Sequence, residues 1–196
     1  QIESRTIVLA EDVTTSTLER LRIERERDYD LLTGLYNRRA FYRFAGRLFD
    51  RPDKMKHAAV VMMDLDNLKR TNDTFGHEWG DRYIHEAAVC FLRNIPDGTL
   101  CARVSGDEFN ILFCGYDSRE AVQRAIDRLV SGVENSHFNL PDGQATRIHV
   151  SGGIAWYPED GTDLMELIKC ADFAMYQMKR NEKGRFGMFD RTQYNQ

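Results

Sequence analysis

The chain has 196 residues, which suits one domain of ordinary size with an appendage. Hydrophobic residues make up 42% of it and charged residues 30%, so a disordered or low-complexity chain is excluded. Its net charge of −4 argues against a general nucleic-acid binder. The longest apolar stretch, residues 58–63, is far shorter than the ~20 residues that span a bilayer, and the N-terminus lacks the pattern of a secretory signal.

The cysteines indicate the redox environment of the protein. The four cysteines form no CxxC pair and no cluster with histidines, so a zinc site is not indicated. Most of their neighbours are apolar, which predicts buried thiols in a reducing cytoplasm. These cysteines are Cys90, Cys101, Cys114 and Cys170.

The first 29 residues predict an appendage. Residues 1–14 contain one short strand, which is too little for a domain and indicates the end of a preceding one. Residues 15–29 are rich in Glu and Arg at helical spacing, and Ser16 is a suitable cap. An apolar seam begins at Leu18 but is interrupted at Arg25, so this helix is either a solvated connector or a weak parallel coiled coil.

From residue 30 onward, helical and strand-like segments alternate. Their order predicts an α+β domain of ferredoxin-like type, with a mostly antiparallel sheet and helices packed on one of its faces. The predicted helices cover residues 39–49, 80–93, 118–134 and 163–180, and the predicted strands cover 58–65, 100–104, 110–114, 147–155 and 186–189.

Two acidic clusters stand at predicted strand ends. Asp64 and Asp66 are two residues apart at the end of the most apolar strand, so their side chains share one face. Asp107 and Glu108 lie in a hairpin turn. Because Mg²⁺ needs one or two carboxylates together with water and phosphate oxygens, Asp64 and Asp107 on adjacent strands would suffice to bind it. The alternative is that the turn acids are only exposed turn formers.

The segment between these clusters has groups suited to a nucleotide. A turn after a strand exposes backbone N–H groups to phosphates, and Lys69 adds positive charge. Asn72 and Asp81 supply donors and acceptors that match the edge of guanine. Lys179 and Lys183, one helical turn apart, are placed to face an anion together, or else only complement the helix dipole.

Six ordered motifs resemble those of the GGDEF family of diguanylate cyclases, over residues 30 to about 190. The signature itself is represented by Ser105-Gly106-Asp107-Glu108-Phe109, similar to Gly-Gly-Asp/Glu-Glu-Phe. The other five are DLLTGLYNRR at residues 30–39, DLDNLKRTND at 64–73, GHEWGD at 76–81, YPEDG at 157–161 and the ADxAMYxxK pattern at 171–179.

The resemblance implies a palm-like domain that condenses two GTP into cyclic di-GMP and releases two pyrophosphates. Each domain would hold one GTP, so a transient or stable homodimer would be required. Carried over by position, Asp64, the carbonyl of Leu65 and Asp107 would bind Mg²⁺ or Mn²⁺, and Asn72, His77 and Asp81 would form the guanine pocket. The amides of Asn67 and Leu68, with Lys69, Lys179 and Lys183, would hold the triphosphate, and Asp107, Glu108 and Lys69 would form the catalytic set.

Two departures from the family pattern bear on activity. Ser105 replaces the first signature glycine, which would cost energy if that position required a positive φ. Residues 96–99 stand where many family members carry an Arg-x-x-Asp product-binding motif, and they contain neither the arginine nor the final aspartate. We therefore expect an active cyclase without that inhibitory site, and the alternative is a catalytically weak GTP-binding regulatory module.

The N-terminal segment has a resemblance of its own. Residues 5–14 are similar to the last strand of a PAS sensor domain and its Asp-Val-Thr exit. This implies a sensor remnant over residues 1–14, a signalling helix over 15–29 and a cyclase domain over 30–196. The whole would be a cytoplasmic part of a larger sensor protein, either soluble or membrane-associated.

Overall fold

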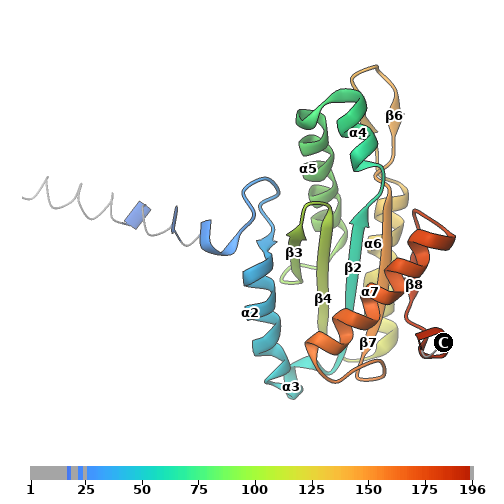
Figure 1. The fold of residues 1–196 in the computed structure, drawn as a ribbon. Coiled ribbons are helices and arrows are strands. Elements are labelled where there is room, and N and C mark those ends of the chain that lie inside the picture. The colour runs from blue at the N-terminus through green and yellow to red at the C-terminus, as the bar shows by residue number, and fades with distance from the viewer. Residues whose placement is uncertain (1–16, 19–21, 24–25, 195–196) are drawn as a thin grey trace, which may run out of the picture.

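The computed structural model describes residues 17–18, 22–23 and 26–194. Its centre is a six-stranded sheet in the order β1-β3-β4-β2-β7-β8 (Figure 1). The four central strands pair antiparallel, and the two edge strands pair parallel to their neighbours. The strands are β1 (Tyr36–Asn37), β2 (His57–Leu65), β3 (Leu100–Ser105), β4 (Glu108–Tyr116), β7 (Val150–Tyr157) and β8 (Phe186–Met188).

The helices begin where the sequence offers caps. The side chains of Asn37, Ser118 and Asp163 each accept a hydrogen bond from a backbone N–H in the first turn of the helix that follows. The longer helices are α2 (Arg38–Phe49), α4 (Leu68–Phe75), α5 (His77–Asn94), α6 (Arg119–Glu134) and α7 (Leu164–Asn181), with short α3 (Pro52–Met55) and α8 (Arg191–Tyr194). The α+β, palm-like class is confirmed.

Helices cover both faces of the sheet, so the prediction of helices on one face is wrong. Val61 and Met63 of β2 pack with α5 and α6, whereas Val60 and Met62 pack with α2 and α7. Figure 1 shows α7 in front of the sheet and α6 behind it. The reason is already in β2, which is buried at every position from residue 58 to 65 without alternation. A strand that is buried on both faces needs cover on both.

Several small elements were not predicted. Helix α4 follows the expected turn after β2, and the two-residue strand β1 extends the sheet beside β3. Strands β5 (Phe138–Asn139) and β6 (Ala145–Thr146) form a separate two-stranded hairpin. Among the described residues, no helix is long and apolar enough to cross a membrane. All four cysteines are free thiols.

The connector helix is fastened to the domain at Asp28. The described parts of the expected 15–29 helix (residues 17–18, 22–23 and 26–28) are helical, whereas the strand expected within residues 1–14 lies outside the described residues. The buried Asp28 carboxylate pairs with Arg43 of α2 at 2.7 Å and with Arg27 at 3.0 Å. Tyr29 stacks on Tyr36 with ring centroids 4.9 Å apart, so the junction has both ionic and apolar contacts.

This junction should make the free energy of unfolding depend on pH in the acid range. Hydrogen bonds from Arg27 and Arg43 lower the pKa of Asp28 to about 2. A carboxyl whose pKa is lowered by folding stabilises the native state above its unfolded pKa, and this stability is lost as the pH falls through about 2. We expect Asp28→Asn to destabilise the domain at pH 6, and the difference from wild type to shrink between about pH 4 and pH 2.

Urea denaturation at each pH measures this difference, with Asp97→Asn in an exposed turn as the matched control. A difference that stays constant down to pH 2 would contradict the assignment of the ion pairs.

Close packing of α7 on β7 depends on Gly153. A Cβ at this position would lie 2.0 Å from the carbonyl oxygen of Ala171 and 2.3 Å from the amide nitrogen of Met175, both in the helix backbone. We expect Gly153→Ala to lower the free energy of unfolding by at least about 2 kcal/mol, because backbone atoms cannot yield as a side chain does. Gly46→Ala in α2 is the matched control, because a Cβ at this position would have no neighbouring heavy atom within 4 Å.

The Gly46→Ala control should therefore stabilise the domain by about 0.5–1 kcal/mol through helix propensity. Thermal or urea denaturation compares the two variants. Equal effects of the two substitutions would show that α7 does not lie against β7 as described.

Candidate active site

The acidic clusters meet at one end of the sheet, as the sequence predicted. Asp64 is directly opposite Glu108 in the β2–β4 pairing. The amide of Leu65 donates a hydrogen bond to the backbone oxygen of Asp107 at 3.0 Å, which fixes the β3–β4 turn against the end of β2. The carboxylates of Asp64 and Asp107 are close enough to repel one another. Two strand ends thus form one acidic site, and Asp107 and Glu108 are more than isolated turn formers.

Asp64 is a buried carboxylate that carries an ion pair. Its side chain lies against Lys179 of α7, with Nζ and Oδ2 2.6 Å apart. Burial raises the pKa of Asp64, the nearby carboxylates of Asp107 and Asp66 raise it further, and the hydrogen bond from Lys179 lowers it. A buried negative charge with further carboxylates beside it is stabilised by a cation. Lys179 supplies one such charge here.

Beyond β2 the chain makes the expected turn at residues 66–67 and then enters a helix that was not predicted. Asn67 has a left-handed backbone (φ 67°), which asparagine tolerates better than most residues, and α4 begins at Leu68. The first N–H groups of a helix have no partner within it, so those of Leu68 and Lys69 are open to an anion. Lys69 is exposed in this first turn.

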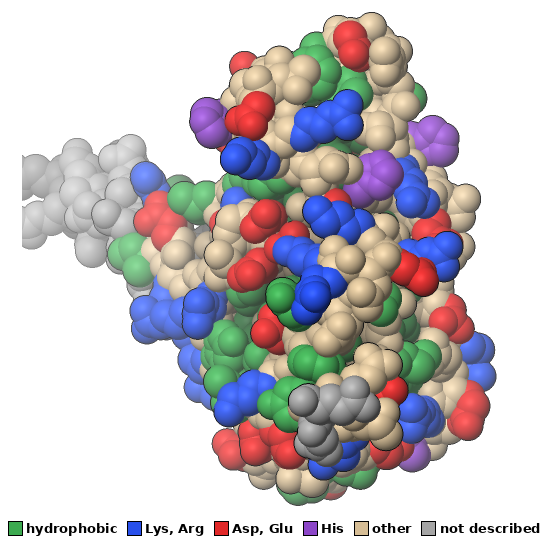
Figure 2. Space-filling view, turned by 45° about the vertical axis from the view of Figure 1, so that its right-hand side comes forward, with side chains coloured by type: hydrophobic (Ala, Val, Ile, Leu, Met, Phe, Trp, Pro, Cys, Tyr) green, Lys and Arg blue, Asp and Glu red, His purple; other side chains and the backbone are tan. Residues whose placement is uncertain are grey.

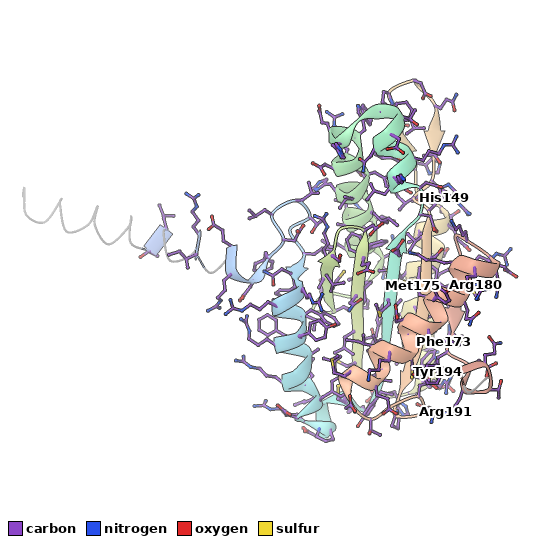
Figure 3. The ribbon with its side chains drawn as sticks, in the orientation of Figure 1. His149, Phe173, Met175, Arg180, Arg191 and Tyr194 are labelled. Atoms are coloured by element: carbon purple, nitrogen blue, oxygen red, sulfur yellow. The ribbon has the colours of Figure 1, made fainter. Side chains whose placement is uncertain are left out.

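Asp66 fixes the strand end in place. Its amide donates to the His149 carbonyl at 2.9 Å, and its carbonyl accepts from the Tyr83 hydroxyl at 3.3 Å. Burial raises the pKa of Tyr83 to about 12, so this hydroxyl keeps its proton at neutral pH. The Asp66 carboxylate accepts from Ser151 at 2.7 Å. Figure 3 shows His149 where β7 begins, at the end of the sheet from which β2 runs into α4.

The residues of the predicted base pocket lie on two neighbouring helices, with Asn72 on α4 and His77 and Asp81 on α5. Asn72 packs against Gly80, where even a Cβ would lie 1.8 Å from its Oδ1. That oxygen is buried and has no hydrogen-bond partner among the described residues. An unpaired buried acceptor is costly, so this atom is suited to a ligand donor. Asp81 and His77 are exposed on α5, and Asp81 also lines a cavity of about 720 Å³.

The two C-terminal lysines are arranged differently from the prediction. Lys179 lies in the last turn of α7, but the helix ends at Asn181 and Glu182 is its C-cap. Lys183 therefore lies in the exposed loop after the helix and does not share a helical face with Lys179. Helical geometry is already lost at Glu182, with φ −146° and ψ 69°, and Gly184 follows in the loop with a φ of 81°.

Ser105 fits its position without backbone strain. Among the described residues, the non-glycine residues with positive φ are Lys56 and Asn67, so Ser105 is not in the left-handed region. Its side chain is exposed, and the residue pairs with Glu108 across the β3–β4 turn. Ser105 therefore does not incur the energetic cost that a positive φ would impose on a serine.

Arg103 supports the signature turn, a role that was not predicted. Its guanidinium donates to the Gly106 carbonyl at 3.0 and 2.8 Å and pairs with Asp30 at 3.2 Å. Asp30 in turn accepts hydrogen bonds from Thr33. Two sequence features could have indicated this contact. An arginine precedes the signature turn in the same strand, and the DLLT motif begins with an aspartate that could pair with it.

A larger cavity lies elsewhere. Its volume is about 1000 Å³, and residues of β1, α2, α3 and the start of β3 line it, including Tyr36, Arg47 and Arg51. None of the predicted site residues lines it. Residues 96–99 form a tight turn nearby, in which the amide of Thr99 donates to the Pro96 carbonyl at 3.2 Å. This hollow is larger than the cavities beside α4 and α5, but it lacks the paired carboxylates.

Positive and negative side chains are mixed on the face of the molecule that carries α7 and β8 (Figure 2). Figure 2, turned toward α7 and β8, shows acidic and basic side chains interspersed on one face. The described residues contain no group of three or more His, Cys, Asp or Glu side chains arranged to hold a metal. A site made of two carboxylates and a backbone carbonyl does not need such a group.

Comparisons with known proteins agree with this geometry. The family model "Diguanylate cyclase, GGDEF domain" matches residues 27–185. Signaling protein YkoW of Bacillus subtilis is 33% identical over 180 residues, which is 91% of this chain and 22% of that protein. Cyclic di-GMP phosphodiesterase PdeR of Escherichia coli is 34% identical over 175 residues, 87% of this chain and 25% of that protein. The chain thus spans about a quarter of the length of each of these two relatives.

Solved structures show the same fold. The GGDEF domain of TpbB from Pseudomonas aeruginosa superposes with a TM-score of 0.76 at 29% identity, over 85% of this chain and 97% of that one. The coiled coil and GGDEF domain of DgcB from Caulobacter crescentus, in complex with c-di-GMP, gives a TM-score of 0.79 at 24% identity, over 95% and 98%. On the family match over residues 27–185, this chain belongs to the GGDEF family of diguanylate cyclase domains.

Proposed function

We propose that this domain is a diguanylate cyclase, which condenses two GTP into cyclic di-GMP and releases two pyrophosphates. The observation that carries the proposal is that Asp64, Asp107 and Glu108 meet at one sheet end, beside the open N-terminus of α4. The domain would act in the cytoplasm of a bacterium, as the output of a larger signalling protein.

The donor set fits a divalent metal ion. Asp64, the carbonyl of Leu65 and Asp107 would hold Mg²⁺ or Mn²⁺, because hard cations prefer carboxylate and carbonyl oxygens. The burial of Asp64 and its contact with Lys179 support this proposal, because a buried carboxylate is stabilised by nearby positive charge. When bound, the metal would neutralise charge that develops on the α-phosphate and on the leaving pyrophosphate.

The chain's own residues would bind and orient GTP. The amides of Asn67 and Leu68 and the side chains of Lys69, Lys179 and Lys183 would receive the triphosphate at the start of α4. Asn72 and Asp81 would hydrogen-bond to the guanine edge, with His77 beside them. These contacts would place the α-phosphate at the ends of β2 and β3.

The reaction would be two phosphoryl transfers between facing domains. The 3′-oxygen of one GTP attacks the α-phosphorus of the other, and the bond from that phosphorus to the bridging oxygen of pyrophosphate breaks. Asp107 accepts the proton of the 3′-hydroxyl, and Glu108 supports the site. The same step in the opposite direction closes the ring. Since each domain holds one GTP, a homodimer that is at least transient is required.

The second candidate is a catalytically weak GTP-binding regulatory module. One relative at 34% identity bears the name of a phosphodiesterase, so a matching domain occurs in a protein named for another activity. Ser105 in the signature also departs from the family pattern. The presence of Asp64, Asp107 and Glu108 favours the cyclase.

Turnover of GTP with Mg²⁺ tests the proposal. We expect cyclic di-GMP to form and Asp107→Asn to reduce its rate by at least about a hundredfold, because the site loses a charged ligand and a proton acceptor. Chromatography of the nucleotides measures the rate over a range of protein concentrations. Asp97→Asn, an exposed turn aspartate outside the site, is the matched control and should retain the wild-type rate.

If Asp107→Asn turns over GTP within a few-fold of wild type, Asp107 has been wrongly assigned. GTP binding without any product would favour the regulatory module.

Residues 96–99 lead to a prediction about feedback. This turn lacks an arginine to pair with phosphate and a carboxylate to pair with guanine. We expect cyclic di-GMP to inhibit only by competing with GTP, so saturating GTP should restore the full rate. Steady-state rates with added product decide this. A lowered maximal rate that excess GTP does not restore would show an inhibitory site elsewhere on the domain.

A further inference from the structure

A chain of hydrogen bonds joins the two sides of the proposed phosphate site. Ser151 Oγ donates to Asp66 Oδ2 at 2.7 Å and accepts from the amide of Gly184 at 3.1 Å. Asp66 follows the end of β2, and Gly184 follows Lys183. We infer that Asp66 and Ser151 are positioning residues that hold Lys183 toward the phosphates of the nucleotide, an inference that rests on the proposed function.

The chemistry of the Ser151 hydroxyl makes this chain directional. A hydroxyl has one proton and two lone pairs, and an ionised carboxylate only accepts. The Ser151 hydroxyl therefore donates its hydrogen bond to the Asp66 carboxylate, and a lone pair on Oγ accepts the hydrogen bond from the Gly184 N–H. Ser151 is 0% exposed and Asp66 9%, so water does not compete for either group. The two bonds fix each other's orientation.

The loop that carries Lys183 has few other anchors. The Glu182 amide closes α7 by donating to the Met178 carbonyl, and the Gly152 amide donates to the Arg185 carbonyl at 2.9 Å. Both of these anchors join backbone to backbone. The Gly184 anchor between them depends on a side chain, and it is the one next to Lys183. Its loss should free Lys183 more than the rest of the loop.

The Asp66 carboxylate is free to act in this way. The strand end is held separately by the Asp66 amide and carbonyl, which bond to His149 and Tyr83. A change of the carboxylate thus leaves the backbone of the metal-binding segment anchored. The alternative is that Ser151 only fastens β8 to the sheet edge, which would affect stability and not recognition of phosphate.

The test compares GTP with GMP as ligands. We would measure binding by calorimetry, using a GTP analogue with a methylene group between its α- and β-phosphates, so that no turnover occurs. We expect Ser151→Ala to weaken binding of the analogue about tenfold, the scale of one lost charge-assisted hydrogen bond, and GMP less than twofold. Asp66→Asn keeps an acceptor for Ser151 and should weaken analogue binding less than Ser151→Ala does.

Ser136→Ala is the matched control. Its hydroxyl also bridges two backbone groups, donating to the Val133 carbonyl at 2.6 Å and accepting from the Ile148 amide at 2.8 Å, but it has no link to Lys183. We expect binding of both nucleotides to be unchanged in this variant. Hydrogen exchange at Gly184 should accelerate in Ser151→Ala only, which reports on the chain of bonds without any nucleotide.

A double variant separates positioning from simple structural support. Lys183→Ala should weaken analogue binding, and adding Ser151→Ala should weaken it no further. If the two losses multiply, or if GMP binding falls as much as analogue binding, the inference is overturned while the proposed function stands. If wild type binds neither nucleotide, the proposed function fails, and faster exchange at Gly184 would then show that the bonds hold only the loop.

Discussion

The buried charge of Asp64 is the constraint around which this domain is organised. A carboxylate at the end of a strand covered on both faces loses most of its hydration, and burial raises its pKa. Only a nearby cation makes the ionised form tolerable. The protein supplies Lys179 from α7, at 2.6 Å. Helix α7 must therefore lie close to β7 and β2, which the glycine at position 153 permits.

The same constraint explains why the site is assembled from distant segments. Strand β2 ends at the acidic site, α4 begins there with open amides, and the loop after α7 returns to the same edge. Each segment is fastened by groups outside the proposed chemistry. Arg103 holds the signature turn through the Gly106 carbonyl, and Tyr83 holds the Asp66 carbonyl. These two contacts hold the site in place without using the side chains proposed to bind a ligand, of which Asp64 and Lys179 pair with each other.

Much of this could be predicted because it depends on local pattern. The apolar run at residues 58–65 indicated a buried strand, and Ser118 and Asp163 marked helix starts that the structure confirms. The two acidic clusters were expected to meet, and they do. By contrast, helices on both faces were missed, although an uninterrupted apolar strand implies two covered faces. That error came from assigning a topology without asking what each face of β2 contacts.

Other features depended on contacts that a sequence does not display. The loop after α7 passes through a left-handed Gly184, whose amide is bound by Ser151, 33 residues away. The turn after β2 passes through a left-handed Asn67, from which α4 begins. In both places a one-residue change of backbone conformation redirects a charged side chain or an amide. Local propensity describes such residues poorly, because distant hydrogen bonds select their conformation.

The arrangement also separates the fold from the chemistry. The two apolar cores, one on each face of the sheet, contain no residue of the catalytic set, which lies in turns and at the ends of strands and helices. A domain of this family can therefore keep its fold while its turn residues change. Ser105 illustrates the point, because it replaces a signature glycine in an exposed turn without entering the left-handed region. For the proposed cyclase activity, the decisive feature is the charge at Asp64, Asp107 and Glu108, and these carboxylates are all present in this chain.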